Sequence, residues 1–79
     1  MIDIELRLFG DFRQYLDVKL GEGFNMKIEN GSTIRKIIVS IGIPLDDAKI
    51  ILVNGRTKDF DDFLFEGDRL AIFPPVAGG

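Results

Sequence analysis

The sequence of 79 residues contains no cysteine and no histidine. The lack of cysteine excludes disulfides and thiolate nucleophiles, and the lack of both residue types removes the usual zinc ligands. Histidine is also the side chain that most often transfers protons near neutral pH. We therefore expect no metal site and no cofactor, and we expect that the chain is not itself a catalyst of the common side-chain mechanisms.

Clusters of positive charge and long hydrophobic runs are also missing. Ten Lys and Arg residues against thirteen Asp and Glu residues give a net charge of -3, so phosphate backbones are repelled more than attracted. No apolar run approaches the roughly 20 residues that span a membrane. The opening "MIDIEL" has acids where a signal peptide has positive charge. We expect a cytoplasmic protein that binds neither nucleic acid nor membrane.

The chain does contain enough apolar side chains for a core. Hydrophobic residues make up 46% of the sequence, and seven of them are phenylalanine. No low-complexity linker or internal repeat interrupts the chain. We expect one globular domain over residues 1–79, close to the lower size limit at which a core stabilises a fold without disulfides or metals.

Two early segments alternate apolar and polar residues, as half-buried strands do. In the first, residues 2–8, the apolar positions are Ile2, Ile4, Leu6 and Leu8. In the second, "FNMKIE", they are Phe24, Met26 and Ile28. The "GDFRQYLD" between them suggests a turn with an irregular return, so the two strands are expected to pair as a hairpin.

A helix is expected next, in "NGSTIRKIIVSIGIP". Ser32 is placed to cap a helix that begins near Thr33, and Gly42 is placed to end it. The i, i+3, i+4, i+7 spacing of four isoleucines predicts an apolar stripe that faces a core: Ile34, Ile37, Ile38 and Ile41.

The last third of the chain predicts three more strands. In "IILVNGR" a short apolar strand runs into Asn54-Gly55, a strong signal for a tight hairpin and, on this interpretation, a turn and nothing more. The segment with Phe60, Phe63 and Phe65 is expected to be a loop anchored by its aromatics. Its acids, Asp59, Asp61 and Asp62, are interpreted as a solvated turn because their spacing lacks the glycine and distal glutamate of a calcium loop. The final strand is Arg69 to Phe73.

The order strand, strand, helix, strand, strand, strand predicts an α+β fold. We expect a β-grasp (ubiquitin-like) fold, with a mixed sheet of four to five strands crossed by one main helix. A helix in the crossover allows the first and last strands to lie side by side and parallel. Phe9 and Phe73 would then project together from the non-core face, as a patch that docks a partner. The alternative is that a loop covers this second face of the sheet, with the aromatic segment at residues 60–65 as one candidate.

The ending "FPPVAGG" is interpreted as an extended, flexible C-terminal tail over residues 74–79. Pro74 and Pro75 fix φ and favour an extended path, and six residues at roughly 3 Å each reach on the order of 18 Å. Val76 and Ala77 are small and apolar, and Gly78 and Gly79 have no Cβ to collide with the walls of a narrow channel. Residues 74–78 are therefore expected to thread into a partner. The terminal carboxylate is a poor electrophile, so its reaction requires activation, for which adenylation is the obvious route.

The stretch "EGDRLAIFPPVAGG" closely resembles the ending of the small subunit of molybdopterin synthase, a ubiquitin-like sulfur carrier, and more loosely that of its thiamine-pathway relative. The opening strand, "VNGR" and the Gly67-Asp68 turn also follow in the order of that family. The sequence differs from it at Thr57, where members carry an apolar residue that contacts the partner, and in the aromatic 60–65 segment.

The resemblance implies that Gly79 carries the chemistry. An ATP-dependent adenylating enzyme would activate its carboxylate, and a sulfurtransferase would supply the sulfur that converts it to a thiocarboxylate. The tail would then enter the large subunit of molybdopterin synthase and give its sulfur to the dithiolene of molybdopterin, in molybdenum cofactor biosynthesis. The chain would be a cosubstrate, with the active site on the larger partner.

Three alternatives stay open from the sequence. The same thiocarboxylate is suited to sulfur transfer in thiamine, cysteine or tungsten-cofactor synthesis. The same tail also suits a ubiquitin-like modifier that is conjugated to lysines through Gly79. The third is a plain interaction module whose tail has no chemical role.

Overall fold

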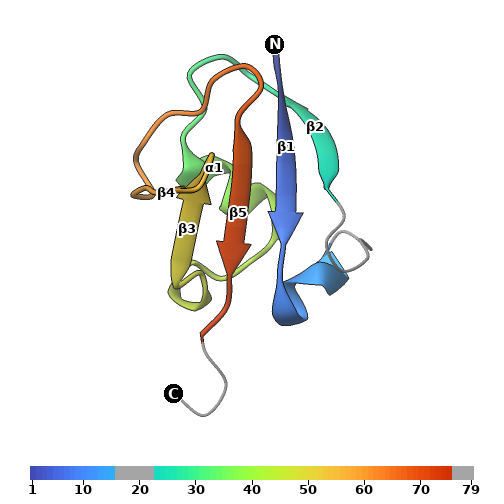
Figure 1. Ribbon diagram of the computed structural model, residues 1–79, viewed down its shortest axis with the longest axis vertical. Coiled ribbons are helices and arrows are strands. Elements are labelled where there is room, and N and C mark those ends of the chain that lie inside the picture. Colours follow the sequence, from blue (N-terminus) through green and yellow to red (C-terminus); the bar gives the residue numbers. More distant parts are fainter. Residues whose placement is uncertain (16–22, 76–79) are drawn as a thin grey trace.

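The computed structural model, which describes residues 1–15 and 23–75, contains one five-stranded mixed sheet with the order β2-β1-β5-β3-β4 (Figure 1). The central strands β1 and β5 run parallel, and the other neighbours run antiparallel. This arrangement confirms the predicted mixed sheet and the predicted pairing of the first and last strands. The strands are β1 (Ile2–Leu8), β2 (Phe24–Ile28), β3 (Ile50–Val53), β4 (Arg56–Thr57) and β5 (Arg69–Phe73).

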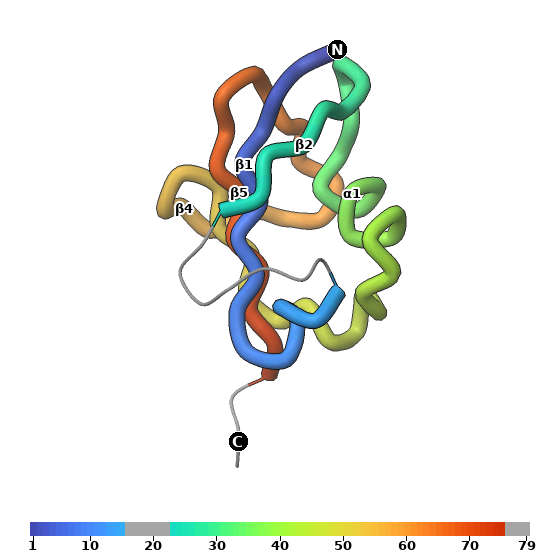
Figure 2. Tube along the Cα trace, turned by 90° about the vertical axis from the view of Figure 1, so that its right-hand side faces the viewer, coloured from blue at the N-terminus to red at the C-terminus, as the bar shows by residue number. Residues whose placement is uncertain are grey.

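Helix α1 (Ile34–Ile41) covers one face of this sheet (Figure 2). Three of the four isoleucines in the predicted stripe are buried, and Ile41 packs against the core while staying partly exposed. The helix ends as predicted at Gly42, whose φ of 101° lies in the left-handed region that glycine tolerates. The Gly42 N–H donates to the carbonyls of Ile38 and Val39, at 3.3 and 3.1 Å.

The N-terminal cap of α1 is Thr33 and not the predicted Ser32. The Thr33 hydroxyl oxygen accepts a hydrogen bond from the Lys36 N–H at 3.2 Å. Ser32 is buried, and its hydroxyl donates to the Glu29 carbonyl at 2.7 Å. Both residue types can cap a helix, and the path of the chain between β2 and α1 decided which of the two adjacent hydroxyls does so.

The core lies between α1 and the sheet. Leu6, Ile34, Ile38, Leu70 and Ile72 are fully buried there, and Leu6 and Leu70 face each other in the β1–β5 register.

Phe12 belongs to the same core, at 4% exposure. It comes from a 3-10 helix, Gly10–Tyr15, in the stretch that the sequence suggested was an irregular turn. The predicted antiparallel pairing of β1 with β2 is confirmed, with Ile4 opposite Met26.

The β3–β4 hairpin turns at Asn54-Gly55, as predicted, with φ values of 54° and 83°. Asn54 does more than turn the chain, which corrects the prediction. Its Oδ1 accepts from the Arg69 N–H and its Nδ2 donates to Asp68 Oδ1, both at 3.0 Å. These hydrogen bonds join the hairpin to the start of β5.

The segment from Lys58 to Asp68 is anchored chiefly by Leu64, at 1% exposure, together with half-buried Phe60. The prediction that its aromatics anchor it was therefore wrong for Phe63 and Phe65, which are 57% and 67% exposed. An alternating extended segment can turn only every second side chain inward, and here the inward residue is Leu64.

Two of the predicted acids of this segment, Asp61 and Asp62, have protein partners. Asp61 pairs with Arg35 Nε at 3.0 Å, and Asp62 accepts from the Asp59 N–H at 2.8 Å. Over residues 1–15 and 23–75, no group of three acidic side chains is arranged to hold a metal ion. The helices of that part of the chain are also too short or too polar to span a membrane.

Candidate functional site

The candidate site is the end of the sheet at which β5 leads into the tail. Parallel strands end at the same edge of a sheet, so the ends of β1 and β5 lie together, with Leu8 opposite Ile72. The Phe9 N–H extends the ladder by one hydrogen bond, to the Ile72 carbonyl at 3.3 Å. Figure 1 shows β5 continuing past this edge into the start of the tail.

Phe9 and Phe73 stack directly on each other at this edge. Their ring centroids are 4.3 Å apart and the ring planes differ by 7°. Both residues are half-buried, because each ring covers one face of the other. The structure therefore brings together the two residues that the sequence placed side by side, while their role in docking stays a prediction.

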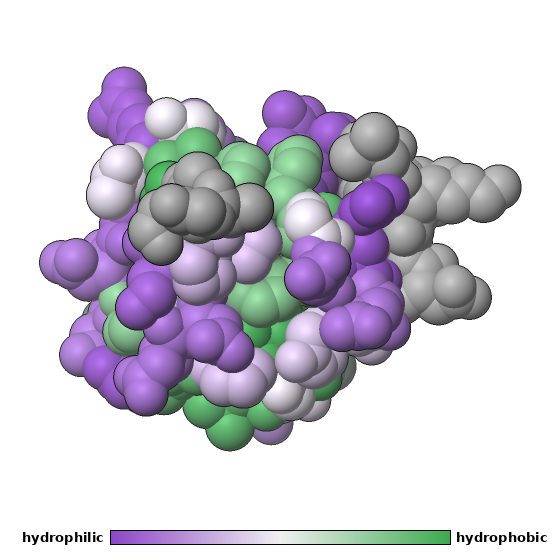
Figure 3. All heavy atoms as spheres, turned by 90° about the horizontal axis from the view of Figure 1, so that it is seen from below, coloured by the Kyte–Doolittle hydropathy of each residue, from purple (hydrophilic) through white to green (hydrophobic). Residues whose placement is uncertain are grey.

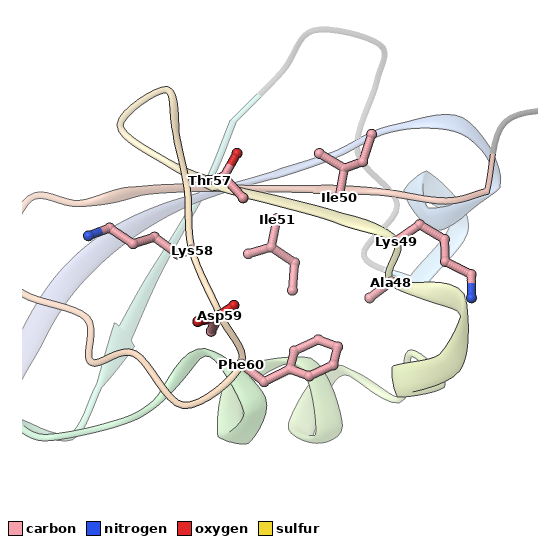
Figure 4. A pocket seen from close by; sticks show the side chains of 8 residues that line it. All are labelled: Ala48, Lys49, Ile50, Ile51, Thr57, Lys58, Asp59 and Phe60. Carbon is pink, nitrogen blue, oxygen red and sulfur yellow. The ribbon is translucent and has the colours of Figure 1, made fainter.

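Ile50 extends this apolar surface onto β3. It lies opposite Phe73 in the β3–β5 register and is 44% exposed. Figure 4 shows Ile50 on the opposite side of the sheet from Ile51, which points toward the helix. We call Phe9, Ile50 and Phe73 the tail-exit patch. Figure 3 looks onto this end of the molecule and shows hydrophobic residues gathered among hydrophilic ones.

The aromatic loop at residues 60–65 does not cover the tail-exit patch, so the alternative is wrong for this segment. The loop lies against the start of α1, on the other side of the sheet. The Ile34 N–H donates to the Asp62 carbonyl at 3.1 Å, and the Arg35 N–H donates to the Phe60 carbonyl at 2.8 Å. Thr57, the position that differs from the resembling family, points to the same side as Ile50 (Figure 4).

Gly10 is a residue of this site that the sequence analysis missed. Its φ is +58°, and a Cβ on it would lie 2.8 Å from Pro74 Cγ, so the first residue of the tail packs directly against the Gly10 backbone. The Lys49 N–H donates to the Phe73 carbonyl at 3.1 Å from the other side. The tail therefore starts from a fixed point between β1 and β3. A glycine directly after a strand was the only signal in the sequence.

Charged residues occupy the same face of the sheet beyond the patch. Glu5 Oε1 accepts from Arg7 Nε at 2.8 Å and from Arg69 Nε at 2.9 Å. The hydrogen bond from Arg7 and then the charges of Arg7 and Arg69 hold the pKa of Glu5 below its ordinary value. An apolar patch beside a polar region has the composition of a protein interface with its rim.

Pro74 and Pro75 are the last residues of the tail that the structure describes. Val76, Ala77, Gly78 and Gly79 lie outside the described residues, so their predicted roles rest on the sequence alone.

The sequence and fold of this chain are similar to those of known proteins. The family model described as Mut7-C ubiquitin matches residues 1–78. No curated protein matches the sequence.

Several solved structures are similar over nearly the whole chain. A protein from Pyrococcus furiosus assigned as molybdopterin converting factor subunit 1 is 27% identical, with a TM-score of 0.74, over 96% of this chain and all of that one. A protein from the complex of subunits 1 and 2 of the Helicobacter pylori molybdopterin-converting factor is 26% identical, with a TM-score of 0.63, over 99% and 100%. Small archaeal modifier protein 1 of Haloferax volcanii is 20% identical, with a TM-score of 0.76, over 96% and 100%, which shows a shared fold. These similarities confirm the β-grasp.

Proposed function

The chain belongs to the Mut7-C ubiquitin family, and from this premise we propose that it is a sulfur carrier whose reactive group is the carboxylate of Gly79. An ATP-dependent adenylating enzyme activates this carboxylate, and a sulfurtransferase provides the sulfur. The thiocarboxylate then donates its sulfur in molybdopterin synthesis, with the chain acting as the small subunit of a two-subunit synthase.

The observation that carries the proposal is the fixed origin of the tail beside an apolar patch. Phe73 is held by its stack with Phe9 and by the Lys49 N–H, and Pro74 packs on Gly10. A partner that docks on the tail-exit patch therefore receives the tail from a defined point and in a defined direction. Such preorganisation lowers the entropic cost of threading the tail into a cleft.

The similarity to subunit 1 of molybdopterin converting factors supports the choice of pathway. One of those structures is a complex of subunits 1 and 2. By analogy, we propose that the acceptor enzyme is a larger subunit of the same kind, and that the tail-exit patch contacts it.

The chemistry requires nothing of the side chains of this protein. The Gly79 carboxylate attacks ATP, forming an acyl adenylate and releasing pyrophosphate. A persulfide on the sulfurtransferase displaces AMP, and a thiol of an enzyme then cleaves the resulting acyl disulfide, which leaves a thiocarboxylate and a disulfide on the enzymes. Because this chain has no cysteine, every thiol in the sequence of steps comes from its partners.

Intact mass spectrometry tests the proposal. The purified chain is incubated with the adenylating enzyme of its own organism, ATP, a cysteine-dependent sulfurtransferase and cysteine. We expect the mass to rise by the difference between sulfur and oxygen, and tandem spectra to place the change at Gly79. The control is a chain that lacks Gly79.

Two results would contradict the proposal. An unchanged mass, with no AMP formed, would indicate an interaction module without carrier chemistry. Activated protein that appears in extracts only as larger conjugates on lysines would indicate a modifier.

A further inference from the structure

Phe63 and Phe65 form a second apolar surface, far from the tail-exit patch. They lie near Val53 and the start of β5, whereas Ile50 and Phe73 lie at the opposite ends of the same two strands. In Figure 1 the loop that carries them runs beside the end of the sheet away from the C-terminal end of the chain. A partner on this surface would leave the tail accessible.

Backbone contacts fix the positions of Phe63 and Phe65, with both residues exposed. Between them, Leu64 is buried, and its N–H donates to the Ser32 carbonyl at 3.0 Å. The Phe65 N–H donates to Asp68 Oδ2 at 2.8 Å. Phe63 forms an isolated antiparallel bridge with Thr33. Because the chain is fixed before, between and after the rings, they are presented in a defined geometry.

The two rings line a groove of about 430 Å³ that also contains Arg56 and Lys58. We call it the Phe63–Phe65 groove. The five ion pairs among the described residues use other cations: Arg7, Lys27, Arg35, Lys36 and Arg69. Neither Arg56 nor Lys58 has an ion-pair partner within residues 1–15 and 23–75.

The one acid that lines the groove is already engaged. Asp68 accepts from Asn54 Nδ2 with one carboxylate oxygen and from the Phe65 N–H with the other. The groove of an acidic protein therefore presents two cations that have no acidic partner in the described part of the chain, beside two exposed aromatic rings. This charge favours an occupant with carboxylates.

We propose that the Phe63–Phe65 groove binds an acidic segment of a protein partner, with an aliphatic or aromatic side chain between the two rings and carboxylates on Arg56 and Lys58. Aromatic residues flanked by arginine are the usual anchors of protein interfaces. The proposal goes beyond the sulfur-carrier chemistry, because the groove is remote from the tail and does not depend on it.

A protein segment fits the groove better than a nucleic acid does. Single-stranded nucleic acid also stacks on aromatics, but it needs a basic path along its phosphates. Here the same loop carries three aspartates, Asp59, Asp61 and Asp62, and the net charge of the chain is -3. A short acidic peptide requires only the two cations that are present.

NMR titration of the isotopically labelled chain tests the proposal. The probe is a synthetic peptide that alternates glutamate with leucine and phenylalanine, and its matched control carries lysine in place of every glutamate. We expect the acidic peptide to shift the amides of Arg56, Lys58, Phe63 and Phe65, with weaker binding at high salt. The lysine peptide should leave those amides unchanged.

Matched variants separate the contribution of the two aromatic rings to peptide binding from that of the two cations. Phe63→Ser with Phe65→Ser should weaken binding about tenfold or more, as expected for the loss of aromatic anchors, whereas Val39→Ser, at a residue 58% exposed on α1, should not. Arg56→Glu with Lys58→Glu should abolish binding, whereas Lys49→Glu should not. Circular dichroism shows whether each variant is folded. We expect the double Phe variant to fold, because Phe63 and Phe65 are each more than half exposed.

Four results of the titration would overturn the proposal. These are no binding of the acidic peptide, equal binding of both peptides, shifts confined to the tail-exit patch, and preferential binding of an oligothymidylate. Self-association of the unmodified chain that is lost in the double Phe variant would also overturn it, because a second copy would then be the occupant.

Discussion

The rings of Phe9 and Phe73 stack 4.3 Å apart and nearly parallel, although 64 positions separate the two residues in the sequence. The parallel pairing of β1 with β5 brings them together. This contact ties the first strand to the point from which the tail leaves, so a change in either ring affects both the fold and the presentation of the tail.

Phe9→Ala is expected to lower the free energy of unfolding by about 1 kcal/mol, since it removes the stacked pair and some apolar burial. Because we assign docking to the tail-exit patch, the free energy of binding to the large subunit should fall by more than the free energy of unfolding does. Urea denaturation and calorimetric titration measure the two effects. Val39→Ala, on the remote helix face, serves as the control, and equal binding by both variants would contradict the assignment of the patch.

Gly10→Ala is expected to cost about 1–2 kcal/mol for the left-handed φ alone, and more because its Cβ meets Pro74 at 2.8 Å. Gly31→Ala is the matched control, because Gly31 has a φ of +81° but no atom within 4 Å of the added Cβ. The difference in unfolding free energy between the two variants isolates the contact with the tail. We also expect slower thiocarboxylate transfer in Gly10→Ala only.

Deletion of Gly79, or addition of one residue after it, should abolish thiocarboxylation while the melting temperature stays unchanged. Among residues 1–15 and 23–75, the buried hydrophobic residues lie between Ile4 and Ile72, so we expect the core to form without Gly79. Intact mass and thermal denaturation of both variants check this prediction. A variant with an added residue that still accepts sulfur would contradict the role of Gly79.

Thr33→Ala should lower stability by about 1 kcal/mol, through loss of the helix cap. The specific readout is hydrogen exchange at the Lys36 amide, which donates to Thr33. That exchange should become faster in Thr33→Ala and not in Ser32→Ala, whose hydroxyl bonds to Glu29 instead. The opposite pattern would return the cap to Ser32.

Stability should decrease in acid partly through Glu5. Its pKa in the folded chain lies below the ordinary value of 4.5 because Arg7, and then Arg69, stabilise its charge. A group with a lowered folded pKa contributes stability above its unfolded pKa, and that contribution is lost as the pH falls through the folded value. Glu5→Gln should therefore lose less stability than the parent chain as the pH falls through 4.5 and below it. Denaturant titrations at several pH values measure this, and parallel curves would refute the role of Glu5.

Periodic patterns made much of the fold predictable. The alternation in β1, the isoleucine stripe of α1 and the Asn54-Gly55 turn each depend on residues close together in the chain, and all three are confirmed. The pairing of β1 with β5 followed from the order of the elements, since a helical crossover permits it. From that pairing, the neighbourhood of Phe9 and Phe73 was also predictable.

Two of the errors occur where neighbouring residues have the same chemistry. Ser32 and Thr33 can both cap a helix, and Leu64 is as apolar as Phe63 and Phe65 beside it. In each case the choice depends on which side chain the approaching segment can reach, and the local pattern carries no information about that approach. The burial of Phe12 was not predicted for a different reason. Phe12 lies in a short 3-10 helix, which has no periodic signal in the sequence.

The sequence by itself determined the order of the strands and the main helix, the apolar faces that form the core, and the glycine ending on which the proposed chemistry depends. These features are properties of residue type and short spacing. Only the tertiary structure decided that Pro74 packs on Gly10, that Asn54 fastens β5, and that Arg56 and Lys58 lie beside two exposed rings without acidic partners among the described residues. The first two relationships join segments that are distant in the chain, and all three exist only after the chain has folded.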